Sequence, residues 1–177
     1  MRHSPPRMTL VLGGARSGKS FYAEKAIEAW PAPWLYLATA QGYDDEMRAR
    51  IALHRDRRPQ GWVTRDVPMD LGSAVAEAAG PVLVDCLTLW LTNLILAEAD
   101  IPPAVAALLE ACAAVPGPVV LVGNEVGLGI VPDNALARRF RDEAGRLHQR
   151  LAAQADRVVF MVAGLSLIMK PGPGDLA

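Results

Sequence analysis

Short apolar runs alternate with longer amphipathic stretches along this chain. The runs are rich in β-branched residues and have the length of buried strands, whereas the stretches between them carry apolar residues at helical spacing. Strands are expected over residues 9–12, 34–38, 82–84, 119–122 and 158–162, and 62–67 is a candidate for a further short strand. Helices are expected over residues 21–30, 44–57, 71–79, 87–99, 104–115 and 134–155. Near-continuous apolar strands separated by helices predict an α/β fold, with a mostly parallel sheet covered on both faces.

Length and composition limit the classes of protein to consider. A chain of 177 residues is long enough for one well-packed domain, so residues 1–177 are expected to form a single unit. Hydrophobic residues make up 51% and charged residues 21% of the chain, which is typical of a globular protein. The net charge of −1 gives no reason to expect a nucleic-acid or membrane surface.

The same pattern indicates a cytoplasmic protein. The longest apolar stretches are interrupted at Asp85, Asn93 and Glu98, so none approaches the length of a membrane span. Residues 1–7 lack the apolar centre of a signal peptide. The two cysteines, at positions 86 and 112, lie in apolar surroundings without metal-ligand spacing, which favours buried free thiols.

A glycine-rich segment between the first strand and the first helix carries the most specific chemical signal. It matches the phosphate-binding pattern G-x-x-x-x-G-K-[ST] at every fixed position. Backbone N–H groups of such a loop surround a polyphosphate, and the helix N-terminus adds partial positive charge. Lys19 is expected to reach the outer phosphates as a catalytic residue, and the Ser20 hydroxyl to hold Mg²⁺. The expected nucleotide-binding residues are Gly13, Gly14, Ala15, Arg16, Ser17, Gly18, Lys19 and Ser20.

Asp85 follows the apolar run 81–84 and therefore lies at the carboxyl end of a predicted strand. Ligands of open parallel sheets gather at that edge, so Asp85 is expected near Ser20, where it would hold Mg²⁺. The alternative is that Asp85 caps the helix beginning near Leu87, because aspartate is favoured at that position. The metal role is the preferred interpretation.

His54 lies in an unusually charged segment, with acidic residues leading and five arginines around the histidine. Neighbouring guanidinium groups favour neutral imidazole and can bind phosphates. Neutral imidazole can attack an α-phosphate and carry a nucleotidyl group covalently. A surface helix with a structural histidine is the alternative.

The glycine-rich segment 123–132 follows another predicted strand and should reach the same edge of the sheet. Gly127 and Gly129 permit close approach of the backbone to a ligand. A ligand contact, a subunit contact and a simple turn before Pro132 all remain open.

These motifs together resemble the bifunctional adenosylcobinamide kinase/adenosylcobinamide-phosphate guanylyltransferases of cobalamin synthesis. The resemblance runs from Met8 to Gly164 and includes the phosphate loop. Its more specific strings are Asp44-Asp-Glu-Met47 with His54, and Asn124-Glu-Val-Gly-Leu-Gly-Ile-Val-Pro132. It implies a RecA-type P-loop fold and the homotrimeric assembly that is typical of the family. It also implies phosphorylation of adenosylcobinamide by ATP or GTP, then GMP transfer from GTP to adenosylcobinamide phosphate.

The resemblance also implies roles for individual residues. His54 matches the histidine that carries GMP covalently, and Asp85 matches the Walker B carboxylate. The remaining positions implied to bind the nucleotide are Arg55, Asp56, Arg57, Arg58, Ala38, Thr39, Ala40 and Asp66. Three positions depart from the family pattern: Ala40 replaces a usual serine, Asp66 a usual glutamate and His148 a common asparagine. These departures affect the expected nucleotide preference more than the reaction.

Two other classes of protein compete with this interpretation. In a plain small-molecule kinase His54 would be structural, and label from the α-phosphate of GTP would not attach to the protein. A nucleotide-operated switch would hydrolyse GTP without an acceptor, but the chain lacks the Asn-Lys-x-Asp motif of switch GTPases.

Overall fold

The computed structural model describes residues 6–41, 58–173 and 175. The predicted helix 44–57, with His54, Arg55, Asp56 and Arg57, lies outside the described residues. All the other predicted strands and helices are present, including the candidate strand at 62–67. The prediction of an α/β fold with a mostly parallel sheet is therefore confirmed.

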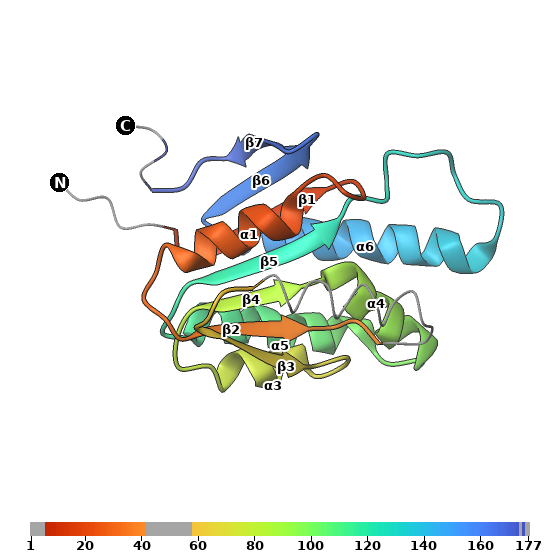
Figure 1. Ribbon diagram of the computed structural model, residues 1–177. Coiled ribbons are helices and arrows are strands. Elements are labelled where there is room, and N and C mark those ends of the chain that lie inside the picture. Colours follow the sequence, from red (N-terminus) through yellow and green to blue (C-terminus); the bar gives the residue numbers. More distant parts are fainter. Residues whose placement is uncertain (1–5, 42–57, 174, 176–177) are drawn as a thin grey trace.

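Seven strands form one sheet in the order β3-β2-β4-β5-β1-β6-β7 (Figure 1). The first six strands are parallel to one another and β7 is antiparallel to β6. The strand bounds are Met8–Gly13 (β1), Trp34–Ala38 (β2), Trp62–Asp66 (β3), Val82–Asp85 (β4), Val119–Asn124 (β5), Arg157–Val162 (β6) and Leu165–Lys170 (β7). The helix bounds are Lys19–Glu28 (α1), Leu71–Ala76 (α3), Leu87–Leu96 (α4), Ile101–Ala114 (α5) and Ala135–Gln154 (α6).

The strands bury side chains on both faces of the sheet, which explains their nearly continuous apolar sequences. Alternate residues such as Leu10 and Leu121 face a large core made with α3, α4, α5 and α6. Their neighbours Val11 and Val120 face a smaller core to which α1 contributes Ala23. Figure 1 shows α1 alone in front of the sheet and the other labelled helices behind it.

The strand β7 is the element that the hydrophobic pattern did not predict. It forms a hairpin with β6, and the two turn residues Ala163 and Gly164 have φ values of 52° and 79°. Two-residue hairpin turns between twisted strands commonly have positive φ at both positions. The Ala-Gly pair between two apolar runs could therefore have predicted this hairpin. Because β7 lies at the sheet edge, most of its side chains are exposed and its sequence lacks a polar–apolar alternation.

The helix α5 begins earlier than predicted, at Ile101 rather than at residue 104. Pro102 and Pro103 occupy its first turn, where a backbone N–H has no partner within the helix. The predicted start at residue 104 was therefore three residues too late.

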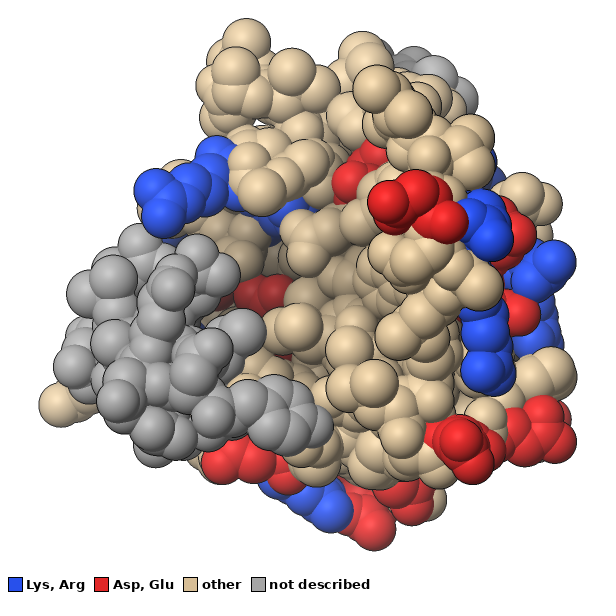
Figure 2. Space-filling model, turned by 90° about the vertical axis from the view of Figure 1, so that its right-hand side faces the viewer, with Lys and Arg blue, Asp and Glu red and all other residues tan. Residues whose placement is uncertain are grey.

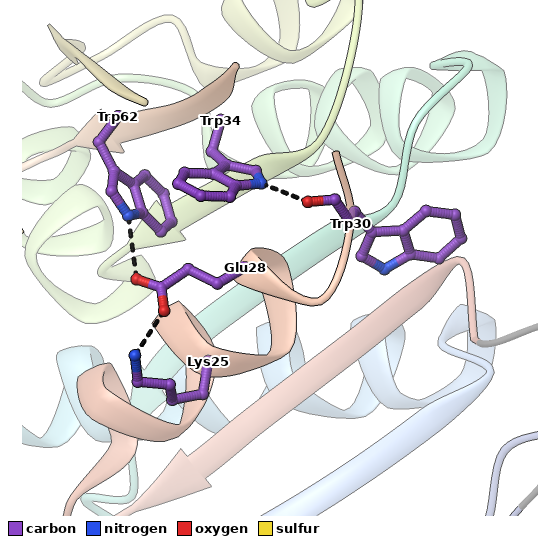
Figure 3. Close-up of polar contacts among 5 residues, drawn as sticks. All are labelled: Lys25, Glu28, Trp30, Trp34 and Trp62. Atoms are coloured by element: carbon purple, nitrogen blue, oxygen red, sulfur yellow. Dashed lines mark hydrogen bonds and ion pairs between the residues drawn. The ribbon is translucent and has the colours of Figure 1, made fainter. Parts of the chain in front are cut away.

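Contacts at the C-terminal end of α1 hold it against β2 and β3 (Figure 3). Trp62 Nε1 donates a hydrogen bond of 3.2 Å to Glu28, whose carboxylate also pairs with Lys25 at 2.5 Å. Trp34 Nε1 donates to the carbonyl oxygen of Trp30 at 2.8 Å. These bonds limit rotation of α1, so they help to orient the glycine-rich loop at its other end.

In the described ranges, no helix combines the length and the apolar character that crossing a membrane requires.

Replacing Leu121 with alanine is expected to lower the free energy of unfolding by about 2–5 kcal/mol, because the side chain is fully buried in the central strand β5. Leu96 is 60% exposed at the end of α4, and its replacement by alanine should cost less than about 1 kcal/mol. Urea unfolding of the two variants measures the difference. Equal destabilisation would contradict the described core.

Candidate functional site

The carboxyl ends of the six parallel strands meet at one edge of the sheet, on the right of Figure 1. Figure 2 faces this edge and shows a hollow with acidic atoms at depth, with uncharged side chains on its right and basic atoms above it. The loop 13–18 connects β1 to α1 here. Gly18 has φ 97°, and an added Cβ on Gly13 would lie 2.4 Å from the carbonyl oxygen of Met161. Both positions therefore require glycine.

Two neighbouring segments hold this loop through backbone hydrogen bonds. Glu125 N donates to the carbonyl oxygen of Gly13, and Gly164 N donates to that of Ser17, each at 3.0 Å. The first bond comes from the segment after β5 and the second from the turn of the β6–β7 hairpin. The unpredicted hairpin therefore helps to shape the phosphate loop.

Lys19, at the first position of α1, is 7% exposed. Its Nζ donates to the carbonyl oxygen of Gly14 and, at 3.4 Å, to the hydroxyl of Ser17. Burial lowers the pKa of this amine from its ordinary value, and the nearby Asp85 opposes that effect. The amine is thus bonded to two residues of the loop itself.

Asp85 lies at the end of β4 and its carboxylate meets α1. Its Oδ2 accepts hydrogen bonds from the hydroxyl of Ser20 at 2.7 Å and from that of Tyr36 at 3.0 Å. The residue that caps α4 is Cys86, so the alternative of Asp85 as the cap of that helix is wrong. The sequence expectation that Asp85 lies near Ser20 agrees with this geometry.

Other predicted nucleotide-binding residues lie at the same edge, on the strands beyond β4. Ala38 is in register with Asp85 on one side and with Asp66 on the other. Ala38 is buried and Ala40, two residues after β2, is partly exposed. Thr39 is fully buried, and its hydroxyl donates to the carbonyl oxygen of Cys86 and accepts from the backbone N–H of that residue. Its side chain thus joins β2 to β4.

Arg58 is the one member of the predicted stretch 54–58 that the structure describes. Its guanidinium carbon lies 3.6 Å from the centroid of the Tyr36 ring, and its Nη1 donates to the Thr64 hydroxyl at 3.1 Å. Arg58 therefore lies beside the residue whose hydroxyl contacts Asp85. Sequence reasoning missed Tyr36, although a tyrosine within an apolar strand signals a buried hydroxyl that needs a partner.

A cavity of about 660 Å³ adjoins the other side of the phosphate loop, towards β6. Its walls come from the loop, the segment after β5, the end of β6 and the β6–β7 turn. Its lining residues outside the loop include Glu125, Leu128, Phe160 and Val162. The phosphate loop therefore has acidic and hydroxyl groups on its β4 side and a cavity with a mainly apolar wall on its β6 side.

The glycine-rich segment after β5 has a buried start and an exposed continuation. Asn124 Nδ2 donates to the Thr88 hydroxyl at 2.9 Å, whereas Leu128 is 83% and Ile130 97% exposed. His148 on α6 is buried beneath it, and an added Cβ on Gly123 would lie 2.8 Å from its Nε2. Burial lowers the pKa of His148, with Glu125 opposing. His148 therefore packs as neutral imidazole behind the sheet edge.

The fold and this edge together define a P-loop nucleotide-binding protein of the RecA-like class. The model of the family described as CobU, cobinamide kinase / cobinamide phosphate guanyltransferase, matches residues 9–169, and the chain belongs to that family. It is accordingly a bifunctional kinase and guanylyltransferase of cobalamin biosynthesis, as the resemblance of its motifs implies.

Curated relatives match over nearly their whole length. The chain is 50% identical over 171 residues to the bifunctional adenosylcobalamin biosynthesis protein CobP of Pseudomonas aeruginosa, covering 93% of this chain and 98% of the relative. It is 45% identical over 181 residues to the bifunctional adenosylcobalamin biosynthesis protein CobU of Salmonella typhimurium, covering 92% and 99%.

Solved structures show the fold at much lower identity. The flagellar accessory protein FlaH of Methanocaldococcus jannaschii superposes with a TM-score of 0.54 at 11% identity, covering 94% of this chain and 79% of that one. An ATPase of the type III secretion system of pathogenic bacteria gives a TM-score of 0.50 at 14% identity, covering 92% and 56%. These likenesses support the RecA-like fold only.

Both cysteines are expected to be unreactive in the native protein. Burial raises the pKa of the Cys86 thiol to about 11, with Asp85 adding to the effect, and burial raises that of Cys112 to about 12. The nucleophilic thiolate is therefore scarce at pH 8. Titration with Ellman's reagent should show both thiols reacting only after unfolding. Rapid labelling of native Cys86 would contradict the described packing beside Asp85.

Proposed function

We propose that the edge bounded by Lys19, Ser20 and Asp85 is the phosphoryl-transfer site of the kinase reaction. The observation that carries this proposal is the hydrogen bond between Ser20 Oγ and Asp85 Oδ2, at the mouth of the glycine-rich loop. In the reaction, the aminopropanol hydroxyl of adenosylcobinamide attacks the γ-phosphorus of ATP or GTP. One P–O bond forms and the bond to the departing nucleoside diphosphate breaks. The Lys19 amine would hold outer phosphate oxygens during transfer.

The Ser20 and Asp85 oxygens fit a magnesium ion. A hydroxyl and a carboxylate, 2.7 Å apart, are the oxygen donors that Mg²⁺ takes in nucleotide sites, where phosphates and water complete its shell. Among the described residues no group of three or more His, Cys, Asp or Glu could hold a metal, so phosphate oxygens would have to contribute. When bound, the ion neutralises charge on the transferring phosphoryl group.

We further propose that His54 carries GMP in the second reaction. Support comes from the two described ends of the segment that contains it. Thr39 is bonded to Cys86, and Arg58 lies against Tyr36, so the segment leaves and returns beside Asp85. Position 54 is only four residues before Arg58 in the chain, and this short connection supports a role for His54 in the same site.

The proposed guanylyl transfer has two steps. The imidazole nitrogen of His54 attacks the α-phosphorus of GTP, forming a P–N bond while the α–β P–O bond breaks and pyrophosphate leaves. A phosphate oxygen of adenosylcobinamide phosphate then attacks the same phosphorus. The P–N bond breaks, adenosylcobinamide-GDP forms and neutral histidine is restored. The predicted nucleotide contacts at positions 38–40, 55–58 and 66 would serve this step.

Incubation with Mg²⁺ and α-³²P-GTP tests the covalent step. Native protein and a His3→Ala control should acquire acid-labile, base-stable label, whereas His54→Ala should acquire none and keep kinase activity. Lys19→Ala should lose both activities by at least about a hundredfold, because both reactions need bound polyphosphate. Labelling of His54→Ala would contradict the histidine assignment. Normal turnover by Lys19→Ala would contradict the phosphate-loop assignment.

Free buried thiols support the proposed cytoplasmic location. Cys86 and Cys112 are both buried and unpaired. Thiols persist in reducing compartments, whereas secreted proteins commonly form disulfides.

We also propose that copies of this chain assemble as a homotrimer through the hairpin β6–β7 and the segment after β5. Support comes from exposed apolar side chains, since such surfaces commonly mark interfaces. The exposed residues of these two parts are Leu128, Ile130, Val131, Val162, Leu165, Leu167, Ile168 and Met169. Leu128 and Val162 line the same cavity, so the two groups are neighbours.

Leu167→Glu is expected to dissociate the assembly, because the charge would be buried between copies. Val63 on β3, at the opposite sheet edge, is similarly exposed, so Val63→Glu is the matched control. Light scattering during gel filtration should give a trimer mass for the native protein and the control, and a monomer mass for Leu167→Glu. An unchanged mass for Leu167→Glu would contradict this interface.

A further inference from the structure

Tyr36 contacts both Asp85, which is bonded to Ser20, and Arg58, which follows the predicted GMP-carrying histidine in the sequence. It lies in the middle of β2 on the α1 side of the sheet and is 5% exposed. Its hydroxyl donates to the same Asp85 oxygen that accepts from Ser20, at 3.0 Å and 2.7 Å respectively. The Asp85 carboxylate is therefore held from α1 and from β2 together.

The ring of Tyr36 also packs against neighbouring side chains. The Arg58 guanidinium lies 3.6 Å from the ring centroid, and the Trp62 ring packs edge-on with centroids 6.0 Å apart. Arg58 is in turn bonded to Thr64 on β3. These contacts restrict rotation of the ring, and so they fix the direction from which the hydroxyl approaches Asp85.

The Tyr36 hydroxyl is the proton donor in its contact with Asp85. Burial, with Asp85 adding to it, raises the pKa of Tyr36 far above its ordinary value, and the Arg58 charge opposes only part of this rise. A neutral phenol beside a carboxylate donates a charge-assisted hydrogen bond, which is stronger and more directional than one between neutral groups.

We infer that Tyr36 is a positioning residue with two separable parts. Its hydroxyl orients the Asp85 carboxylate towards Ser20 and the metal of the nucleotide complex, and its ring places Arg58 for guanylyl transfer. This inference rests on the proposed metal role of Asp85. Groups that orient a ligand residue from behind commonly change metal affinity by tenfold or more when removed.

Tyr36→Phe separates the two parts, because it removes the hydroxyl and keeps the ring. Binding of Mn²⁺ to the protein–GDP complex can be measured by electron paramagnetic resonance without turnover. We expect Tyr36→Phe to weaken Mn²⁺ binding by about tenfold, while the unfolding temperature stays near its native value. Tyr22→Phe is the matched control, since Tyr22 is a partly buried tyrosine on α1 whose hydroxyl makes no bond to Asp85, and it should bind Mn²⁺ normally.

Tyr36→Leu removes the ring as well, and should reduce the rate of labelling by GTP at least several-fold in addition to weakening Mn²⁺ binding. Asp85→Asn supplies the reference for the metal site. If Asp85→Asn weakens Mn²⁺ binding and Tyr36→Phe does not, the role of the hydroxyl is overturned and the proposed metal site stands. Native Mn²⁺ affinity in Asp85→Asn would overturn the metal site and this inference with it. Native labelling by Tyr36→Leu would overturn the role of the ring.

Discussion

The hydrogen bond between the Ser20 hydroxyl and the Asp85 carboxylate joins segments 65 residues apart, and the arrangement of the site depends on it. It exists because the parallel register ends β1 and β4 at the same edge, with β5 between them. Gly13 pairs with Asn124, and Asp85 pairs with Val122. A slip of one residue would turn every side chain of a strand to the other face, so burial on both faces also fixes where the functional groups lie.

The small core between α1 and the sheet links this bond to the rest of the site. α1 begins with Lys19 and Ser20, and its other end is held to β2 and β3 through Glu28, Trp30, Trp34 and Trp62 (Figure 3). Tyr36 lies between these contacts and Asp85. Movement of α1 relative to β2 would therefore change the Ser20–Asp85 contact. It would also shift Arg58, because the Arg58 guanidinium packs on the Tyr36 ring. The residues proposed for the kinase reaction and Arg58, proposed for guanylyl transfer, are thus both positioned by the small core between α1 and the sheet.

Much of this architecture was predictable because its causes are local. The buried parallel strands have continuous apolar runs, and the phosphate loop has a fixed spacing of glycine, lysine and serine. Asp85 could be placed because parallel strands end at a common edge. β7 could not be predicted from burial, since its edge position leaves it exposed, and only the Ala163-Gly164 turn signalled it.

Contacts between distant residues were the least predictable part of the site. The roles of Tyr36 and Thr39 depend on which strands are neighbours, and the strand order is a property of the whole sheet. For His54 the residue pattern left a structural role open, and the resemblance to a family pointed to the covalent one. Its assignment stays a prediction, because the residue lies outside the described part of the chain.

A crystal structure with Mg²⁺ and a non-hydrolysable GTP analogue would test the central claim most directly. The account predicts the polyphosphate within the loop 13–18, and the metal at about 2.1 Å from Ser20 Oγ with Asp85 in or next to its shell. It also predicts that Lys19 Nζ exchanges the Gly14 carbonyl oxygen for phosphate oxygens. A triphosphate bound elsewhere, with Lys19 still on Gly14 and Asp85 remote from the metal, would contradict it.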